Sequence, residues 1–226
     1  MPQPPEGIRT YKLRRSRITA GQSSAIRDLG GRLLLSPSGT VPDEAWAGKY
    51  SAFVLEIGFG MGEGTLAYSL AQPEAAILAV DLHTPGIGNL LRNLAAADRD
   101  NVRVVEADAL ALLSDSIADG RLDGIRIFFP DPWPKARHHK RRLLSTPNLT
   151  LMAQRVRAGG FLHFATDWPD YAEWTRELLL AHPDWELLPP GESCALADPL
   201  SRPRTKFEER GINAGRPIAD LVARRR

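Results

Sequence analysis

Short apolar runs recur along the chain, and all but the last stop abruptly at a glycine, an acidic residue or a proline, which limits the folds open to it. The runs cover residues 53–57, 77–80, 102–105, 124–129 and 161–165, with helix-like patterns between several of them. Apolar runs of this length suit strands that are buried on both faces of a parallel sheet. Their alternation with helices predicts an α/β fold, doubly wound and mostly parallel, with helices on both faces of the sheet.

The segments around these runs complete the expected order of elements. Helices are expected over 64–71, through 90–94, over 147–157 with a glycine pair closing it at 159–160, and over 169–181. Residues 185–188 and 218–223 are candidate closing strands. With 226 residues, of which 43% are hydrophobic, one domain can bury its own core. We expect a basic N-terminal arm and cap segment over 1–49 and the main domain over 50–226.

Cysteine content and hydropathy bear on the expected compartment. The single cysteine, Cys194, has no second thiol with which to form an intramolecular disulfide or to hold a zinc ion, so no metal site is expected. No apolar run reaches about 18 residues, and residues 1–17 lack the apolar stretch of a secretory signal. These features predict a cytoplasmic protein with no membrane partner, and they leave both a monomer and a homodimer open.

Basic residues are gathered into three clusters, although the formal net charge of the chain is only +2. The clusters lie within residues 9–17, 135–142 and 202–210. Each one alone is the kind of solvated surface or tail that many proteins have. Three such clusters in a nearly neutral chain indicate a polyanionic partner.

Three glycines on alternate positions, Gly58, Gly60 and Gly62, follow the first apolar run. A residue without Cβ lets backbone N–H groups approach a ligand, so a nucleotide-like ligand is expected here. Dinucleotide-binding domains have similar loops, so the glycines alone do not identify the cofactor. Glu56, two positions before the first glycine, would repel a pyrophosphate but can pair with the cationic amino acid half of S-adenosylmethionine. The loop therefore favours a methyl donor over NAD.

Acidic residues end the next two apolar runs. Asp81 stands about 20 residues after the loop, where a carboxylate receives ribose hydroxyls in either class of cofactor. Asp108 has two interpretations of equal weight, a contact with the exocyclic amine of adenine or the N-cap of a helix.

After the fourth run, three prolines surround one carboxylate and one large aromatic ring in Phe129-Pro130-Asp131-Pro132-Trp133-Pro134-Lys135. A stiff backbone is a good platform for a positioned group. In an arbitrary protein this segment would be a structural turn with a half-buried tryptophan. Its place at the carboxyl end of a strand, beside the expected cofactor crevice, favours a catalytic role.

This segment resembles the signature of the bacterial tRNA (guanine-N7)-methyltransferases, in which Pro-Asp-Pro-Trp-Pro-Lys is followed by histidine and basic residues. The resemblance extends through residues 56–62, 165–168 and 205–211, in the family's order. It implies a Rossmann-like, S-adenosylmethionine-dependent methyltransferase that modifies N7 of a guanine in tRNA, in the variable-loop region. Residues 1–49 have no usable match and no assigned role.

The resemblance also implies roles for individual residues, to which the loop argument adds Gly58 and Gly60. It implies that Glu56, Asp81, Asp108 and Asp131 line the cofactor site and that Asp131 is catalytic. Related sequences often have Glu where this chain has Asp81, so its ribose contact can be bridged by water. The residues implied to meet the substrate are Lys135, Asp167, Thr205, Lys206, Phe207 and Glu208.

The basic segment that follows Lys135 suits contacts with backbone phosphates, and the target base would leave its stack to reach the pocket. The candidate RNA-binding residues are Arg137, His138, His139, Lys140, Arg141 and Arg142. Plain surface is the alternative for the two histidines.

Guanine N7 carries an in-plane lone pair and no proton, so its methylation needs no general base. The remaining work is to align the reacting atoms, exclude water and stabilise the positive charge that moves to the base. A carboxylate that accepts from the guanine N1–H and amine can orient the base and stabilise its positive charge. Asp131 and Asp167 both suit this role. Trp133 suits either stacking on the base or the core.

Other functions share part of the pattern. A methyltransferase acting on another RNA or on a small molecule is the nearest alternative. A nicotinamide-dependent dehydrogenase has the same fold, but nothing near Asp131 supplies its proton donor. A non-catalytic RNA-binding module would explain the basic clusters and not the carboxylates at the strand ends.

Overall fold

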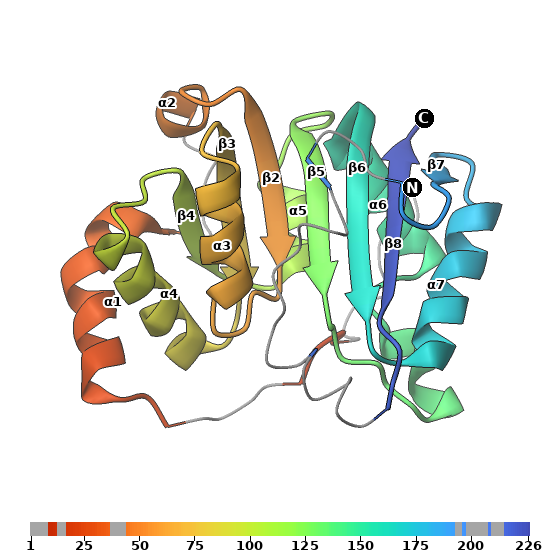
Figure 1. The fold of residues 1–226 in the computed structure, drawn as a ribbon, viewed down its shortest axis with the longest axis horizontal. Helices are drawn as coiled ribbons and strands as arrows, with labels where there is room; N and C mark the ends of the chain where they lie inside the picture. Colours follow the sequence, from red (N-terminus) through yellow and green to blue (C-terminus); the bar gives the residue numbers. More distant parts are fainter. Residues whose placement is uncertain (1–8, 13–16, 37–43, 193–195, 198–207, 209–214) are drawn as a thin grey trace.

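The computed structural model describes residues 9–12, 17–36, 44–192, 196–197, 208 and 215–226, and an eight-stranded sheet forms its centre (Figure 1). The strands lie in the order β1, β4, β3, β2, β5, β6, β8, β7. From β1 to β6 neighbouring strands are parallel, whereas β8 is antiparallel to β6 and β7. Their bounds are β1 Leu34–Leu35, β2 Ala52–Ile57, β3 Ala75–Asp81, β4 Val102–Glu106, β5 Leu122–Phe128, β6 Val156–Thr166, β7 Trp185–Leu187 and β8 Ala219–Arg225.

Helices cover both faces of this sheet, which confirms the predicted fold class (Figure 1). One face carries α1 (Ala20–Leu33), α3 (Glu63–Ala71) and α4 (Thr84–Ala96), and the other carries α5 (Ala109–Asp115), α6 (Thr146–Arg155) and α7 (Pro169–Ala181). The short helix α2 (Glu44–Ala47) and the 3-10 helix η1 (Ala136–Arg141) complete the order. Within the described ranges, no helix has both the length and the apolar character needed to cross a membrane.

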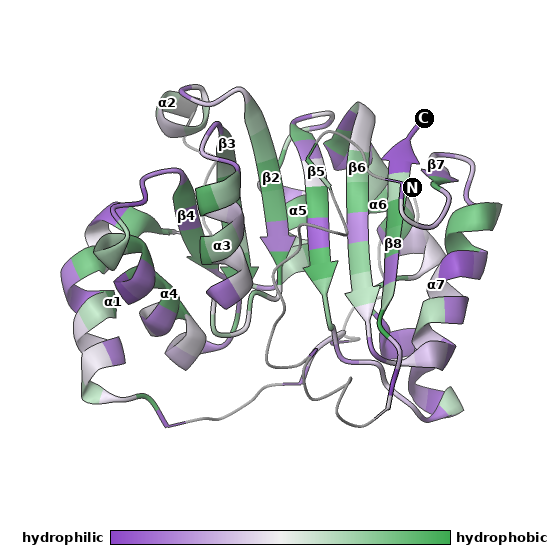
Figure 2. Cartoon of the chain, in the orientation of Figure 1, coloured by the Kyte–Doolittle hydropathy of each residue, from purple (hydrophilic) through white to green (hydrophobic). Residues whose placement is uncertain are grey.

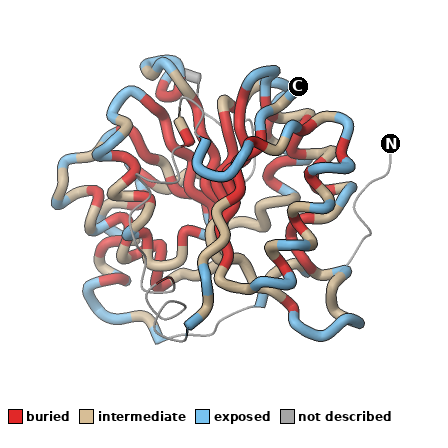
Figure 3. Tube along the Cα trace, turned by 45° about the vertical axis from the view of Figure 1, so that its right-hand side comes forward, coloured by how far each residue is buried: buried red, intermediate tan, exposed pale blue. Residues whose placement is uncertain are grey.

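Alternating residues of β2 contribute to two apolar cores, one on each face of the sheet. Phe53, Leu55 and Ile57 belong to the core beneath α5, α6 and α7, and Val54 belongs to the core beneath α3 and α4. Figure 3 shows the sheet as a buried centre inside a more exposed outer layer. Glu56 lies on the same face as Val54, so its carboxylate enters an apolar region and needs polar partners there.

The change of direction between β2 and β5 determines where a ligand can bind. From β2 the chain continues through β3 to β4 on one side, whereas β5 and β6 continue on the other side. β2 and β5 are parallel neighbours, with Val54 opposite Gly124 and Ile57 opposite Ile127. In open α/β sheets the ligand site lies at the carboxyl ends of the strands where the order reverses.

The junction between α6 and β6 differs from the sequence prediction. The helix predicted to reach residue 157 ends at Arg155, and β6 begins at once with Val156. Gly159 and Gly160 do not close that helix, because they lie inside β6 where its register with β5 shifts. A Cβ on Gly160 would lie 2.7 Å from the carbonyl oxygen of Asp123, so the glycine allows a close approach between the strands.

The structure also contains regular elements before residue 50 that the sequence patterns did not indicate. α1 begins with a capping box between Thr19 and Gln22, and it packs against α4. Leu34–Leu35 then forms the edge strand β1 beside Val104–Val105. At the other end of the chain, the two closing strands are confirmed as β7 and β8.

Candidate active site

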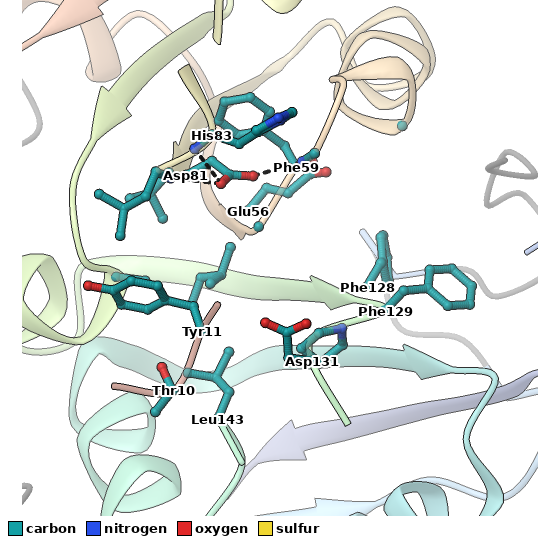
Figure 4. A pocket seen from close by; sticks show the side chains of 18 of the residues that line it. Thr10, Tyr11, Glu56, Phe59, Asp81, His83, Phe128, Phe129, Asp131 and Leu143 are labelled. Carbon is teal, nitrogen blue, oxygen red and sulfur yellow. Dashed lines mark hydrogen bonds between the residues drawn. The ribbon is translucent and has the colours of Figure 1, made fainter. Parts of the chain in front are cut away.

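A cavity of about 340 Å³ lies at the carboxyl ends of β2, β3 and β5. Its walls come from the glycine loop after β2, the end of β3, the loop after β5 and residues 10–12. Figure 4 shows Glu56, Phe59, Asp81 and His83 on one side, and Thr10, Tyr11, Asp131 and Leu143 on the other. The predicted cofactor loop and the predicted catalytic loop therefore face the same space.

The glycine loop has a backbone that other residues adopt only with strain. Gly58, Gly60 and Gly62 have φ angles of 77°, 58° and 80°, all in the left-handed region. A Cβ added to Gly58 or Gly60 would meet no atom within 4 Å, so both leave room at the cavity wall. A Cβ on Gly62 would lie 2.7 Å from Cβ of Leu90, so this third glycine serves the packing of α3 against α4.

Asp81 ties the glycine loop to the end of β3. Its Oδ2 accepts from the Gly60 amide at 2.8 Å, and its Oδ1 accepts from the amides of Leu82 at 2.7 Å and His83 at 3.0 Å (Figure 4). A carboxylate offers about four lone-pair sites, so these three bonds leave about one for a ligand. Asp81 thus shapes the loop before any ligand binds.

Glu56 is buried and already paired. Its Oε2 lies 2.8 Å from a guanidinium nitrogen of Arg126 on β5, and its Oε1 accepts from the Thr65 hydroxyl at 3.1 Å. Arg126 was not singled out from the sequence. The available signal was a charged residue between Ile125 and Ile127 in an otherwise apolar strand, because a buried charge in such a run needs a partner.

Asp131 lines the cavity, near the start of the loop that follows β5. Its Oδ2 accepts from the backbone amide of Lys12 at 2.8 Å. Residues 9–12 cross this loop beneath the carboxyl end of β5 (Figure 1), and Thr10, Tyr11 and Lys12 line the cavity. The N-terminal segment therefore belongs to the site, a contribution that no motif in residues 1–49 indicated.

Trp133 belongs to the core of this loop and not to an open stacking surface. It is 5% exposed, its indole nitrogen donates to the Thr10 carbonyl at 3.0 Å, and the Arg141 guanidinium lies 3.8 Å from its ring centroid. Its φ of 45° is unusual for a large side chain. Of the two interpretations left open by the sequence, the structure supports the core.

Arg142 stands apart from the other predicted phosphate-binding residues. Its side chain is fully buried, donates to the Pro132 carbonyl at 3.1 Å and forms an ion pair with Asp170 at the start of α7. A guanidinium held in this way cannot reach a backbone phosphate without breaking these contacts. Arg142 instead fixes the loop that carries Asp131, because it binds the carbonyl of the next residue, Pro132.

The rest of the basic segment lies at the surface as η1. Arg137 and Lys140 are exposed, Arg141 is half-buried over Trp133, and His139 contacts the Arg142 guanidinium. Partial burial and the neighbouring cations, Arg137 first, lower the pKa of His138 from its ordinary value of 6.5. The lowered pKa favours the neutral imidazole of His138, which can offer hydrogen bonds.

The remaining predicted site residues that the structure describes do not line the cavity. Asp108 caps α5 by accepting from the amides of Leu110 and Ala111, which confirms its N-cap interpretation. Asp167 accepts from two guanidinium nitrogens of Arg216, at 2.9 and 2.7 Å. Lys135 is exposed and Glu208 is buried, whereas Thr205, Lys206 and Phe207 lie outside the described residues.

Comparison with known proteins identifies the family. A family model described as a putative methyltransferase matches residues 51–221. A tRNA (guanine-N(7)-)-methyltransferase of Streptomyces coelicolor is 47% identical over 220 residues, which cover 96% of this chain and 81% of that protein. The chain belongs to the tRNA (guanine-N7)-methyltransferase family. A further member, from Thiobacillus denitrificans, is 44% identical and covers 97% of this chain and 96% of its own.

Solved structures of other methyltransferases have a similar fold, although their sequence identity to this chain is much lower. The 16S rRNA methyltransferase KamB superposes with a TM-score of 0.53 at 20% identity, over 80% of this chain and 89% of its own. The antibiotic-resistance methyltransferase Kmr gives 0.53 at 18% identity, over 81% and 91%. At this level of identity, the likeness confirms the Rossmann-like fold alone.

The Arg142–Asp170 pair predicts a pH-dependent contribution to stability. The hydrogen bond from Arg142 holds the pKa of the Asp170 carboxyl below its ordinary value of 3.8. A carboxyl with a lowered folded-state pKa stabilises the protein above its unfolded pKa, and this stability is lost as the pH falls through the folded value. Asp170→Asn should therefore lower the free energy of unfolding by about 1 kcal/mol at pH 7, a value reduced by the exposure of Asp170, and by less at pH 3, which lies below the ordinary pKa of the carboxyl.

Urea unfolding at both pH values measures this difference. In an Arg142→Met background, Asp170→Asn should have almost no effect at either pH, because the partner is gone. An equal loss at pH 7 and pH 3 would contradict a role for the charged pair.

Proposed function

We propose that this chain transfers a methyl group from S-adenosylmethionine to N7 of a guanine in tRNA. The observation that carries the proposal is that one cavity brings the glycine loop and the Asp131 loop together in a chain of this family. The position in the tRNA implied by the resemblance, the variable-loop region, stays a prediction.

The cavity fits the proposed methyl donor in shape and in chemistry. Gly58 and Gly60 leave space at the wall that a side chain would fill. Glu56 and Asp81 supply acceptors for the amino acid and ribose parts, and Phe128 and Phe129 supply apolar surface. S-adenosylmethionine, when bound, supplies a methyl group activated by its sulfonium. The alternative role of Asp108 is a contact with the exocyclic amine of adenine. For this contact, the Asp108 side chain would have to reach the amine from just outside the residues that line the cavity.

Asp131 is the better placed of the two candidate carboxylates for the guanine. It lies in the cavity, whereas the Asp167 carboxylate is held by the Arg216 guanidinium. Asp131 accepts from the Lys12 amide, and a carboxylate has about four lone-pair sites in all, so Asp131 can also accept from the guanine N1–H and amine. A fixed carboxylate there would orient the base and stabilise the positive charge it acquires.

The exposed part of η1 and Lys135 form the proposed tRNA contact, which we call the basic rim. Its members are Lys135, Arg137, His138, Lys140 and the outer part of Arg141. These side chains follow the Asp131 loop directly, so a phosphate bound here would hold the RNA beside the cavity. Thr205, Lys206, Phe207 and Glu208 are further proposed substrate contacts.

Binding of the methyl donor tests the cofactor site. Gly58→Ala should weaken binding of S-adenosylmethionine by about tenfold or more, because the new Cβ enters the cavity wall and the left-handed backbone is strained. Gly191→Ala is a matched control, since Gly191 also has a left-handed φ, meets nothing within 4 Å and lies outside the cavity lining. Calorimetry should show normal affinity for the control, and equal affinities for both variants would contradict the site.

Replacement of Asp131 tests the chemical step. Asp131→Asn keeps the size of the side chain and removes its charge, so single-turnover methylation of tRNA should slow by about 100-fold or more. The affinity for S-adenosylmethionine should change much less, because the lost interaction acts on the guanine. Asp167→Asn, measured in parallel, should keep most of the rate, and the opposite ranking would move the catalytic role to Asp167.

The salt dependence of tRNA binding tests the basic rim. Arg137→Ala combined with Lys140→Ala should weaken binding and lower the slope of log K against log salt by about 1.5, since two phosphate contacts are lost. Arg27→Ala combined with Arg32→Ala removes two exposed cations from α1 and should leave the slope unchanged. If both pairs reduce the slope equally, the rim has no specific part in binding.

A further inference from the structure

A polar band lies at one level of the neighbouring strands β2, β5 and β6, between apolar residues of the same strands (Figure 2). Glu56 is in register with Arg126, and Arg126 is in register with His163. His163 has its own partner, because its Nε2 lies 2.9 Å from Asp220 Oδ1. Of these paired groups, Glu56 is the one that also lines the cavity, so the Glu56–Arg126 pair reaches the proposed cofactor site.

Neighbouring side chains hold Arg126 in one orientation. Only 2% of the residue is exposed, and its guanidinium carbon lies 3.6 Å from the Tyr68 ring centroid and 4.9 Å from that of Phe128. Tyr68 is fixed in turn, because its hydroxyl donates to the Leu196 carbonyl at 2.9 Å. A planar guanidinium stacked on an aromatic ring keeps its donors in a defined direction, here toward Glu56.

Glu56 is held through both of its oxygens. Arg126 donates to Oε2 at 2.8 Å, and the fully buried Thr65 donates to Oε1 at 3.1 Å. A carboxylate has about four lone-pair sites, so about two stay available. Since Glu56 lines the cavity, these sites can accept from a donor group of a ligand, such as an ammonium.

Stability alone does not explain a charge pair in this position. A buried ion pair is often no better for stability than apolar residues of similar size, because both charges lose their water. The next side chain on the same face of β5, Phe128, is apolar, and so are Ile125 and Ile127 on the opposite face. The pair is therefore better explained by what it offers to the cavity.

We propose that Arg126 is a positioning residue that aims the Glu56 carboxylate at the ammonium of the amino acid half of the methyl donor. This inference rests on the proposed function. It has a second consequence: because Arg126 neutralises Glu56, the wall recognises the ligand by directed hydrogen bonds and not by an unbalanced negative charge.

Two ligands that differ only in the amino acid half provide the test. S-adenosylhomocysteine carries this half, whereas 5′-methylthioadenosine keeps the adenine, ribose and sulfur and lacks it. Glu56→Gln and Arg126→Met should each weaken binding of S-adenosylhomocysteine by about tenfold or more and change binding of 5′-methylthioadenosine by about twofold or less. The double variant should lose little more than either single variant, because both changes act through one contact.

Controls separate positioning from general damage to the fold. The double variant carries no unpaired buried charge, so it keeps the test possible if Arg126→Met alone is unstable. Arg155→Met removes another largely buried arginine, outside the cavity lining, and should affect neither ligand. Arg126→Lys, which keeps the cation and loses the planar fork, should give an intermediate affinity for S-adenosylhomocysteine.

Two outcomes would overturn the positioning role. One is an equal loss for both ligands in Arg126→Met, and the other is unchanged or tighter binding of S-adenosylhomocysteine by that variant. If the wild-type protein binds neither ligand, the proposed function itself fails, and that result is distinct from the other two.

Discussion

The reversal of strand order between β2 and β5 is the constraint on which the whole site depends. Because the connections from these two strands run in opposite directions, their carboxyl ends leave a crevice that no crossover helix fills. The glycine loop and the Asp131 loop leave the sheet at this point, from neighbouring strands. Two motifs separated by about seventy positions in the chain are thereby brought to face one cavity.

Around this cavity, the acidic groups are organised by donors of the protein itself. Asp81 accepts backbone amides of the glycine loop and of its own strand end, and Glu56 accepts from Arg126 and Thr65. Asp131 accepts from the Lys12 amide. Such bonds fix each carboxylate before a ligand arrives, so binding need not pay for ordering these side chains. Because each carboxylate already accepts hydrogen bonds from the protein, a ligand can make fewer bonds to it than to a carboxylate without such partners.

The sequence predicted some elements well for physical reasons that are visible in particular residues. Strands β2 to β6 are apolar runs in a parallel sheet buried on both faces, and such runs are a strong local pattern. The helix α1 was missed because its apolar face is weak and because its main support, the packing on α4, is not local. Gly159 and Gly160 were misinterpreted because a glycine pair after a helical pattern suits both a helix end and an irregular strand. Arg142 looked like its basic neighbours, and only burial against Asp170 and Pro132 sets it apart.

The amino-acid sequence by itself determined the α/β class, the glycine loop and the identity of the carboxylates at the strand ends, because these depend on local hydropathy and on residue types at short spacing. The tertiary structure decided which of those carboxylates share a cavity and which are occupied elsewhere. Asp131 faces the cavity while Asp167 is bound to Arg216, and Glu56 is paired with a cation from the neighbouring strand β5. Residues 9–12 joined the site in the same way, through contacts with a loop more than a hundred positions away. Such pairings depend on strand order and on packing between distant segments, which no local pattern encodes.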